Sequence, residues 1–168
     1  MDIIKFAMQM EMDGKKFYEK AAEAAAEKEV KEILLYLAEE EVRHFNFFKT
    51  LKEGGDTAAA AKALEGGALS NTKNVFVKLI EQGKDKSFGE DTRATWQEAR
   101  VTEEKSVKVY ADEAAKETDP QRKSLLNKIA DEERNHVYLI DNMLLFMADP
   151  QSYSDSRGFS DFMSWEGR

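Results

Sequence analysis

The chain has 168 residues, the size of one ordinary domain, and it is rich in Ala, Glu, Lys and Leu with only two prolines and nine glycines. Its net charge of −8 argues against nucleic acid or an anionic membrane as the main partner. The absence of cysteine excludes disulfides, iron–sulfur clusters, thiolate zinc sites and cysteine nucleophiles. We therefore expect an all-α protein in which any metal is bound by carboxylate, imidazole, carbonyl or water.

The chain shows neither a signal peptide nor a membrane span. Its N-terminus has no basic segment followed by an apolar run. The most apolar stretch, 137–148, is too short to cross a bilayer. We expect a cytoplasmic protein.

The first hundred residues contain two long periodic segments and a connector. Apolar residues recur at helical spacing from the candidate N-cap Asp2 onwards, and no Gly or Pro separates this stripe from the one beginning at Val30. Local signals therefore also permit one very long helix. In the connector that follows, pairs of glycines bracket an alanine-rich piece. We predict short helices over 57–64 and 74–82, and then a polar loop over 83–89.

The second half of the chain has clearer boundaries. A third long helix is predicted over about 91–117, and Asp119-Pro120 marks a stop and restart, with Asp as N-cap and Pro in the first helical position. The fourth helix runs to about Ala148. The remaining residues, 149–168, form a polar tail whose aromatic side chains dock either on the bundle or on a second subunit.

The chain contains an internal repeat. Residues 7–18 align with 99–110, and residues 37–44 align with 129–136, both at an offset of 92 residues. The chain is therefore two copies of one helical hairpin.

The repeat also settles the ambiguous turn. Because the second copy turns at Asp119-Pro120, the first should turn near 26–28. A hairpin folded there sets Glu11 level with Glu41, whereas a single straight helix would hold them about 45 Å apart. We predict an antiparallel four-helix bundle over 1–148. Its parts are hairpins at about 2–52 and 91–148, joined by a long crossover at about 53–90.

Each long helix carries one glutamate inside its apolar stripe, and two of these glutamates are followed at i+3 by histidine. The six residues are Glu11, Glu41, His44, Glu103, Glu133 and His136. Four buried carboxylates at one level would repel each other and lose hydration, and two divalent metals would cancel their charge. Residues i and i+3 share a helix face, so one Glu and one His can reach the same ion. We predict a site for two iron ions, with manganese, zinc or a mixed pair as alternatives.

With these motifs, residues 3–148 resemble the ferritin-like superfamily and, within it, the rubrerythrin-like di-iron domains. The resemblance implies a non-haem di-iron oxidoreductase that reacts with hydrogen peroxide or dioxygen, as a peroxidase or ferroxidase, in defence against oxidative stress. It also implies a homodimer. The alternatives are a ferritin-like protein for iron storage or delivery, a structural di-metal (zinc) protein without redox turnover, and a metal-free bundle.

The sequence departs from the rubrerythrin pattern in two ways. It lacks the cysteines of a rubredoxin module, so electrons are expected from another protein of the rubredoxin type. Rubrerythrins usually also carry an extra Glu one turn after the third-helix ligand, and here that position is Ser106. The ligand set is therefore more symmetrical, like that of bacterioferritin.

Two further pairs are candidates for supporting roles. Tyr18 and Tyr110 lie two turns beyond Glu11 and Glu103, either as hydrogen-bond donors or redox-active neighbours of the ligands, or as ordinary core aromatics. The other pair, Glu40 and Glu132, either orients the histidines or forms part of a solvated surface.

Overall fold

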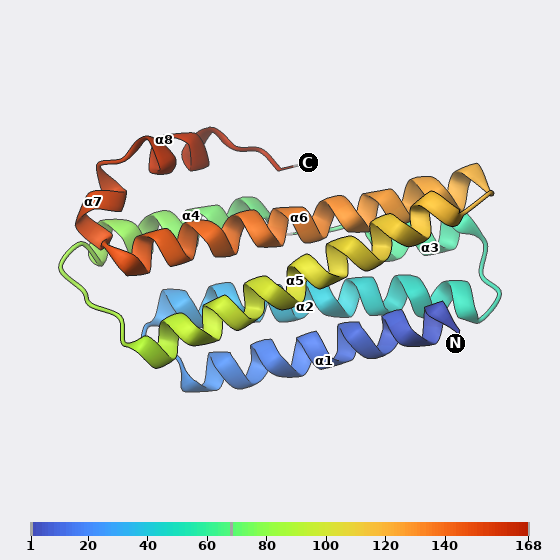
Figure 1. The fold of residues 1–168 in the computed structure, drawn as a ribbon, viewed down its shortest axis with the longest axis horizontal. Helices are drawn as coiled ribbons and strands as arrows, with labels where there is room; N and C mark the ends of the chain where they lie inside the picture. Colours follow the sequence, from blue (N-terminus) through green and yellow to red (C-terminus); the bar gives the residue numbers. More distant parts are fainter. Residues whose placement is uncertain (1, 68, 168) are drawn as a thin grey trace.

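The computed structural model describes residues 2–67 and 69–167, and within them it contains helices and no strand (Figure 1). The helices are α1 (Ile3–Ala24), α2 (Lys28–Lys52), α3 (Thr57–Ala63), α4 (Leu69–Gln82), α5 (Glu90–Lys116), α6 (Pro120–Ala148), α7 (Pro150–Ser154) and α8 (Arg157–Ser164). In this part of the chain, no helix combines the length and the apolar character that crossing a membrane requires.

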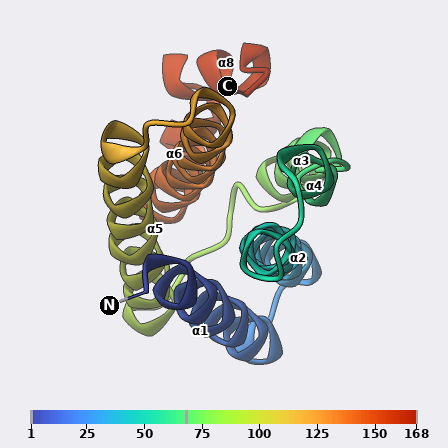
Figure 2. The same ribbon diagram turned by 90° about the vertical axis from the view of Figure 1, so that its right-hand side faces the viewer.

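The four long helices form an antiparallel bundle. Helices α1 and α2 form one hairpin, and α5 and α6 form the other (Figure 2). Between the hairpins, α3 and α4 make a crossover beside α2 that returns the chain to the end of the bundle where α5 begins (Figure 1). The predicted all-α fold is confirmed.

The helix boundaries follow from local capping chemistry. The Asp2 carboxylate accepts a hydrogen bond from the backbone N–H of Ile4 at 3.0 Å, and the Asp119 carboxylate accepts one from Arg122 at 2.8 Å. Pro120 occupies the start of α6, where its missing N–H costs nothing. The first hairpin turns between Ala24 and Lys28 without Gly or Pro, at the place indicated by the repeat.

The core consists of two apolar clusters with a polar layer between them. On each long helix, the inward Glu lies between residues of the two clusters. On α1, for example, Ala7 belongs to one cluster and Tyr18 to the other, and Glu11 lies between them. On α6 the order is Ile129, then Glu133, then Leu139. The packing of both clusters therefore holds the polar layer at one level of the bundle.

Helix α4 begins at Leu69, five residues before the predicted start at residue 74. Its first turn is polar in sequence, and its support comes from the C-terminal segment. The Lys73 ammonium donates hydrogen bonds to the backbone carbonyl oxygens of Met163, at 3.0 Å, and of Trp165. Contacts between residues so far apart in the chain leave no local signal.

The C-terminal segment contains two short helices that its polar composition does not indicate. Asp149 ends α6 and also caps α7, accepting a hydrogen bond from Ser152 at 3.0 Å. The ring centroid of Phe162 lies 4.9 Å from that of Phe76 of α4, and the ring centroid of Trp165 lies 4.6 Å from that of Tyr138 of α6. These aromatic side chains therefore dock on the bundle of their own chain.

Candidate metal centre

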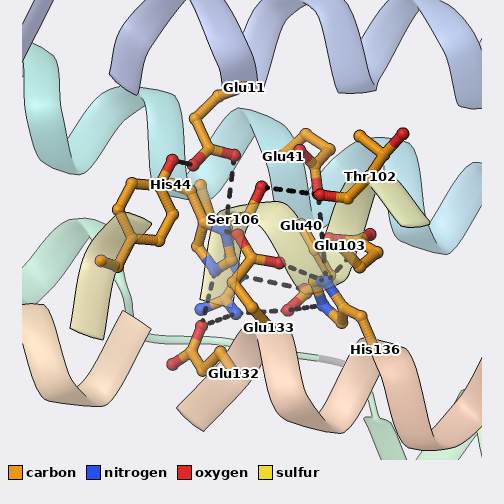
Figure 3. Close-up of polar contacts among 12 residues, drawn as sticks. Glu11, Glu40, Glu41, His44, Thr102, Glu103, Ser106, Glu132, Glu133 and His136 are labelled. Carbon is orange, nitrogen blue, oxygen red and sulfur yellow. Dashed lines mark hydrogen bonds and ion pairs between the residues drawn. The ribbon is translucent and has the colours of Figure 1, made fainter. Parts of the chain in front are cut away.

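The structure brings all six predicted ligands together in the middle of the bundle. Figure 3 shows their side chains converging, with Glu11 from α1, Glu41 and His44 from α2, Glu103 from α5, and Glu133 and His136 from α6. Each residue is at most 4 % exposed. The polar layer is therefore buried between the two apolar clusters.

The six side chains form two overlapping groups, each able to surround one ion. Possible ligand atoms of Glu11, Glu41, His44 and Glu133 all lie within 4.8 Å of one another. Ligand atoms of Glu41, Glu103, Glu133 and His136 meet the same limit. Because Glu41 and Glu133 belong to both groups, their carboxylates are placed to bridge two ions.

Both imidazole rings point the same nitrogen at the carboxylates. His44 Nδ1 lies 3.1 Å from Glu133 Oε1, and His136 Nδ1 lies 3.1 Å from Glu133 Oε2. The two oxygens of one bridging carboxylate therefore face different histidines. The rings are stacked, with centroids 5.7 Å apart and an interplanar angle of 23°.

Two buried carboxylate oxygens, Glu11 Oε2 and Glu41 Oε1, make no hydrogen bond to the described protein. Buried acceptors without a partner are costly and rare in native proteins. One cation beside each oxygen would satisfy them both. The donor set, of four carboxylates and two imidazoles, is also one that iron and manganese accept. The residues present therefore fit a pair of divalent metals.

The two buried tyrosines each form a hydrogen bond from one hairpin to the other. The Tyr18 hydroxyl on α1 donates a hydrogen bond to Glu103 on α5, and the Tyr110 hydroxyl on α5 donates one to Glu11 on α1. The structure therefore shows the hydrogen-bonded alternative for both side chains. Each tyrosine fixes the non-bridging carboxylate of the other hairpin.

The rubrerythrin family model matches residues 2–144. The chain belongs to the rubrerythrin family. This family is part of the ferritin-like superfamily, and its domains contain sites that bind two iron ions. Searches of curated proteins and of solved structures found no match.

The rubrerythrin centre is supported on its outer side by an ionic cluster. His44 Nε2 lies 3.0 Å from Glu132 Oε2, and His136 Nε2 lies 3.8 Å from Glu40 Oε2. Each glutamate thus faces the histidine of the other hairpin, on the side away from the four ligand carboxylates. This position supports the orienting role considered for both residues.

Arg43 connects this cluster, and sequence reasoning missed it. Its guanidinium donates to Glu40 Oε1 at 3.0 Å and to Glu132 Oε2 at 2.9 Å, and it also donates to the backbone carbonyl of Leu64 in the crossover. The repeat held a signal, because the equivalent position in the second hairpin is Asn135. Because only the first hairpin carries a basic residue at this position, its single guanidinium serves both Glu40 and Glu132.

Burial and mutual repulsion raise the pKa of the bridging carboxylates. Burial and the charge of Glu103 raise the pKa of Glu133 to about 7. Burial and the charges of Glu103 and Glu11 raise the pKa of Glu41 well above its ordinary value. By contrast, the pKa of Glu103 falls to about 2, because the charge and hydrogen bonds of His136 outweigh the effect of burial.

Both histidines hold protons more strongly than usual. Burial acts to lower their pKa, but nearby carboxylates outweigh it, chiefly Glu133 beside His44 and Glu103 beside His136. Burial raises the pKa of Tyr18 and Tyr110 well above 10.0, and so does the nearest carboxylate, which is Glu103 beside Tyr18 and Glu11 beside Tyr110. Without metal, protons therefore provide the charge compensation that cations would provide.

Gly14 provides the space for one bridging ligand. A Cβ atom added at this position would overlap the carboxylate of Glu41. Gly14 lies inside a helix and has no positive φ, so its backbone conformation does not require glycine. The absence of a side chain matters instead because it lets the Glu41 carboxylate approach α1 closely.

Proposed function

We propose that the chain is a non-haem di-iron oxidoreductase that reacts with hydrogen peroxide or dioxygen. One observation carries the proposal, namely that two four-residue groups of buried ligands share Glu41 and Glu133. A site for two ions with common carboxylates suits chemistry that needs two electrons at once. Membership of the rubrerythrin family supports the same reading.

Iron would be held by the six ligands, and its contribution would be two electrons together with Lewis acidity toward the bound oxidant. Reduction of hydrogen peroxide to two water molecules consumes two electrons and two protons. The protein's part is to fix the carboxylates and exclude bulk water.

The tyrosines fix the carboxylates from within the core. Tyr18 and Tyr110 are protonated at neutral pH, as tyrosine normally is, and their raised pKa keeps them protonated at higher pH as well, so each hydroxyl keeps its hydrogen bond to Glu103 or Glu11. These bonds hold the non-bridging ligands in place while the charge of the centre changes. Glu132 does the same for His44 from the outside.

The electrons that restore the reduced centre would come from a separate protein of the rubredoxin type. The 168 residues contain no cysteine to hold an iron–sulfur centre of their own. A homodimer likewise remains a prediction.

The test is anaerobic loading of the apoprotein with two equivalents of Fe(II), followed by rapid mixing with hydrogen peroxide or dioxygen. The near-ultraviolet absorbance of the oxidised iron centre is then followed in time. Fast oxidation by peroxide and slow oxidation by dioxygen would support a peroxidase. Fast oxidation by dioxygen with release or mineralisation of iron would instead support a ferroxidase and storage role.

Two variants distinguish iron oxidation at the buried site from oxidation of iron bound elsewhere on the protein. Glu133→Ala removes a bridging ligand and should abolish the absorbance change. Glu39→Ala removes an exposed carboxylate on α2 and should leave it intact. Binding of two irons without oxidation by either reagent would contradict the redox proposal and favour a structural site.

A further inference from the structure

A pocket between α1 and α5 leads from the surface to the candidate metal centre. It has a volume of about 280 Å³, and its inner wall includes Glu41 and Glu103. We call it the α1–α5 pocket. Glu41 lines this wall although it is only 4 % exposed, and its Oε1 atom makes no hydrogen bond to the described protein. The pocket therefore reaches a ligand that needs a cation.

Small side chains leave this pocket open. Gly14 on α1 and Ser106 on α5 both line it, and they occupy equivalent positions of the repeat, 92 residues apart. The Ser106 hydroxyl donates to the backbone carbonyl of Thr102 on its own helix, at 3.3 Å. It is therefore held along α5 instead of bridging to α1.

The charge of the pocket favours cations over anions. Asp13 and Glu98 are exposed at its outer part, and the carboxylates of Glu41 and Glu103 lie at its inner end. Lys105 is the basic residue of the lining. At the mouth of the pocket the exposed carboxylates of Asp13 and Glu98 outnumber the single ammonium of Lys105, so the mouth has a negative potential that attracts cations.

A second cavity, at the end of the bundle, offers a useful contrast. It has a volume of about 160 Å³, and apolar side chains such as Ile4, Phe48 and Leu126 form most of its wall. It reaches Tyr110 but none of the six ligands. Its two carboxylates, Glu113 and Glu117, are paired with Lys116 and Arg122, so its charged lining has no excess of negative charge to attract a cation.

We propose that the α1–α5 pocket is the port through which a divalent cation enters and leaves the metal centre, with Gly14 and Ser106 as its aperture. The inference rests on the proposed di-metal site. In this route a cation exchanges water first for the outer carboxylates and then for Glu41 and Glu103.

The test follows Co(II) uptake by the apoprotein in a stopped-flow instrument, using the visible absorbance of bound cobalt, and then cobalt removal by a chelator. Ser106→Leu places an apolar side chain in the aperture, and Leu126→Phe is the matched change in the end cavity. We expect Ser106→Leu to slow uptake and removal by similar factors of roughly tenfold or more, because packed interiors yield little. Two Co(II) should still bind per chain, and Leu126→Phe should match the wild type.

A second pair of variants tests the port without filling it. Asp13→Asn combined with Glu98→Gln should slow uptake about threefold at low ionic strength, and the difference should vanish in high salt. The control is Glu23→Gln combined with Glu39→Gln, two exposed carboxylates outside the pocket lining. If Ser106→Leu itself lowers the cobalt content, the comparison of the Asp13→Asn, Glu98→Gln double variant with this control tests the port instead.

The possible failures are distinguishable. If the wild type binds two Co(II) and the pocket variants take them up at its rate, the port is wrong and the metal centre stands. If Leu126→Phe alone slows uptake, cations enter through the end of the bundle. If the wild type binds no pair of ions, both the port and the proposed function are wrong.

Discussion

At the scale of single residues, the centre depends on side chains that hold its ligands as much as on the ligands themselves. Tyr18 and Tyr110 each donate a hydrogen bond to a buried carboxylate that originates in the other hairpin. Gly14 leaves room for Glu41. These contacts connect α1 to α5 and to α2 at the level of the polar layer, so single substitutions there should have measurable effects.

Tyr18→Phe should destabilise the apoprotein by about 1.5–3 kcal/mol, because a hydrogen bond to a buried charged group is lost. Urea unfolding at constant pH measures this change. Tyr138→Phe is the control, since that ring is partly buried beside Trp165 and lies outside the centre. An equal effect from both variants would show that the bond from Tyr18 to Glu103 contributes nothing particular.

Gly14→Ala should displace the Glu41 carboxylate and weaken metal binding by about tenfold, which corresponds to about 1.4 kcal/mol. Competition with a chromophoric chelator measures the affinity. Ser106→Ala, at the equivalent position of the other hairpin, should bind metal like the wild type. Unchanged affinity in Gly14→Ala would mean that the glycine is not needed for this ligand.

At the scale of the elements, Arg43 ties α2 to α6 and to the crossover. Its partners Glu40 and Glu132 face the two histidines, so this one cation supports both halves of the centre. Burial acts to raise the pKa of Glu40, but its contacts with His136 and Arg43 lower it to about 2. Burial likewise acts to raise the pKa of Glu132, but His44 and Arg43 lower it, so both acidic partners are anionic and face the guanidinium.

Arg43→Leu should cost about 2 kcal/mol of unfolding free energy, because it leaves two largely buried anions without their common cation. Arg43→Lys should be intermediate, since an ammonium cannot match the planar fork of the guanidinium. Thermal or urea unfolding measures both variants. The control is Arg134→Leu, which removes a more exposed ion pair with Asp131 and should cost less than about 1 kcal/mol. A loss no greater than that of the control would contradict this role.

Features set by helical periodicity and by the repeat could be predicted from the sequence, whereas features set by contacts between distant residues could not. The hairpins, the Asp119-Pro120 turn and the six converging side chains could be predicted because they follow from helical periodicity and an internal repeat. The early start of α4 could not, since Lys73 is held by the C-terminal segment. The contacts of Arg43 with Leu64 and Glu132 could not either, because these partners lie in the crossover and in α6, and only Glu40, three residues earlier in the same helix, is a local partner.

At the scale of the whole molecule, two similar hairpins place equal numbers of ligands around a common centre. Each hairpin supplies one non-bridging glutamate, one bridging glutamate and one histidine. Each also sends a tyrosine to the other hairpin. Metal binding and the packing of the two hairpins should therefore be coupled, and pH should affect the apoprotein and the metal-loaded protein differently.

The pKa of Glu133, raised from 4.5 to about 7, gives the sign of this effect. A raised pKa means that the folded apoprotein keeps a proton which the unfolded chain releases, so the associated stability is lost as pH rises from about 4.5 through 7. The raised pKa values of His44 and His136 act in the same direction. Metal displaces these protons, so metal affinity should increase with pH.

Urea unfolding across about pH 5 to 8 should therefore show the apoprotein losing stability while the metal-loaded protein gains it. Calorimetric titration with Zn(II) in buffers of different ionisation enthalpy should show proton release on binding. Parallel pH profiles with and without metal would contradict the coupling.

The central claim is that six buried side chains hold two metal ions through shared carboxylates, and metal content per chain tests it most directly. Chains equilibrated with excess Fe(II) under anaerobic conditions and then desalted would be assayed for iron by mass spectrometry. We predict two ions in the wild type, one in Glu11→Ala, which lacks a non-bridging ligand, and fewer than one in Glu133→Ala, which lacks a bridging one. A wild type that retains no more than one ion, or a Glu133→Ala variant that retains two, would contradict the account.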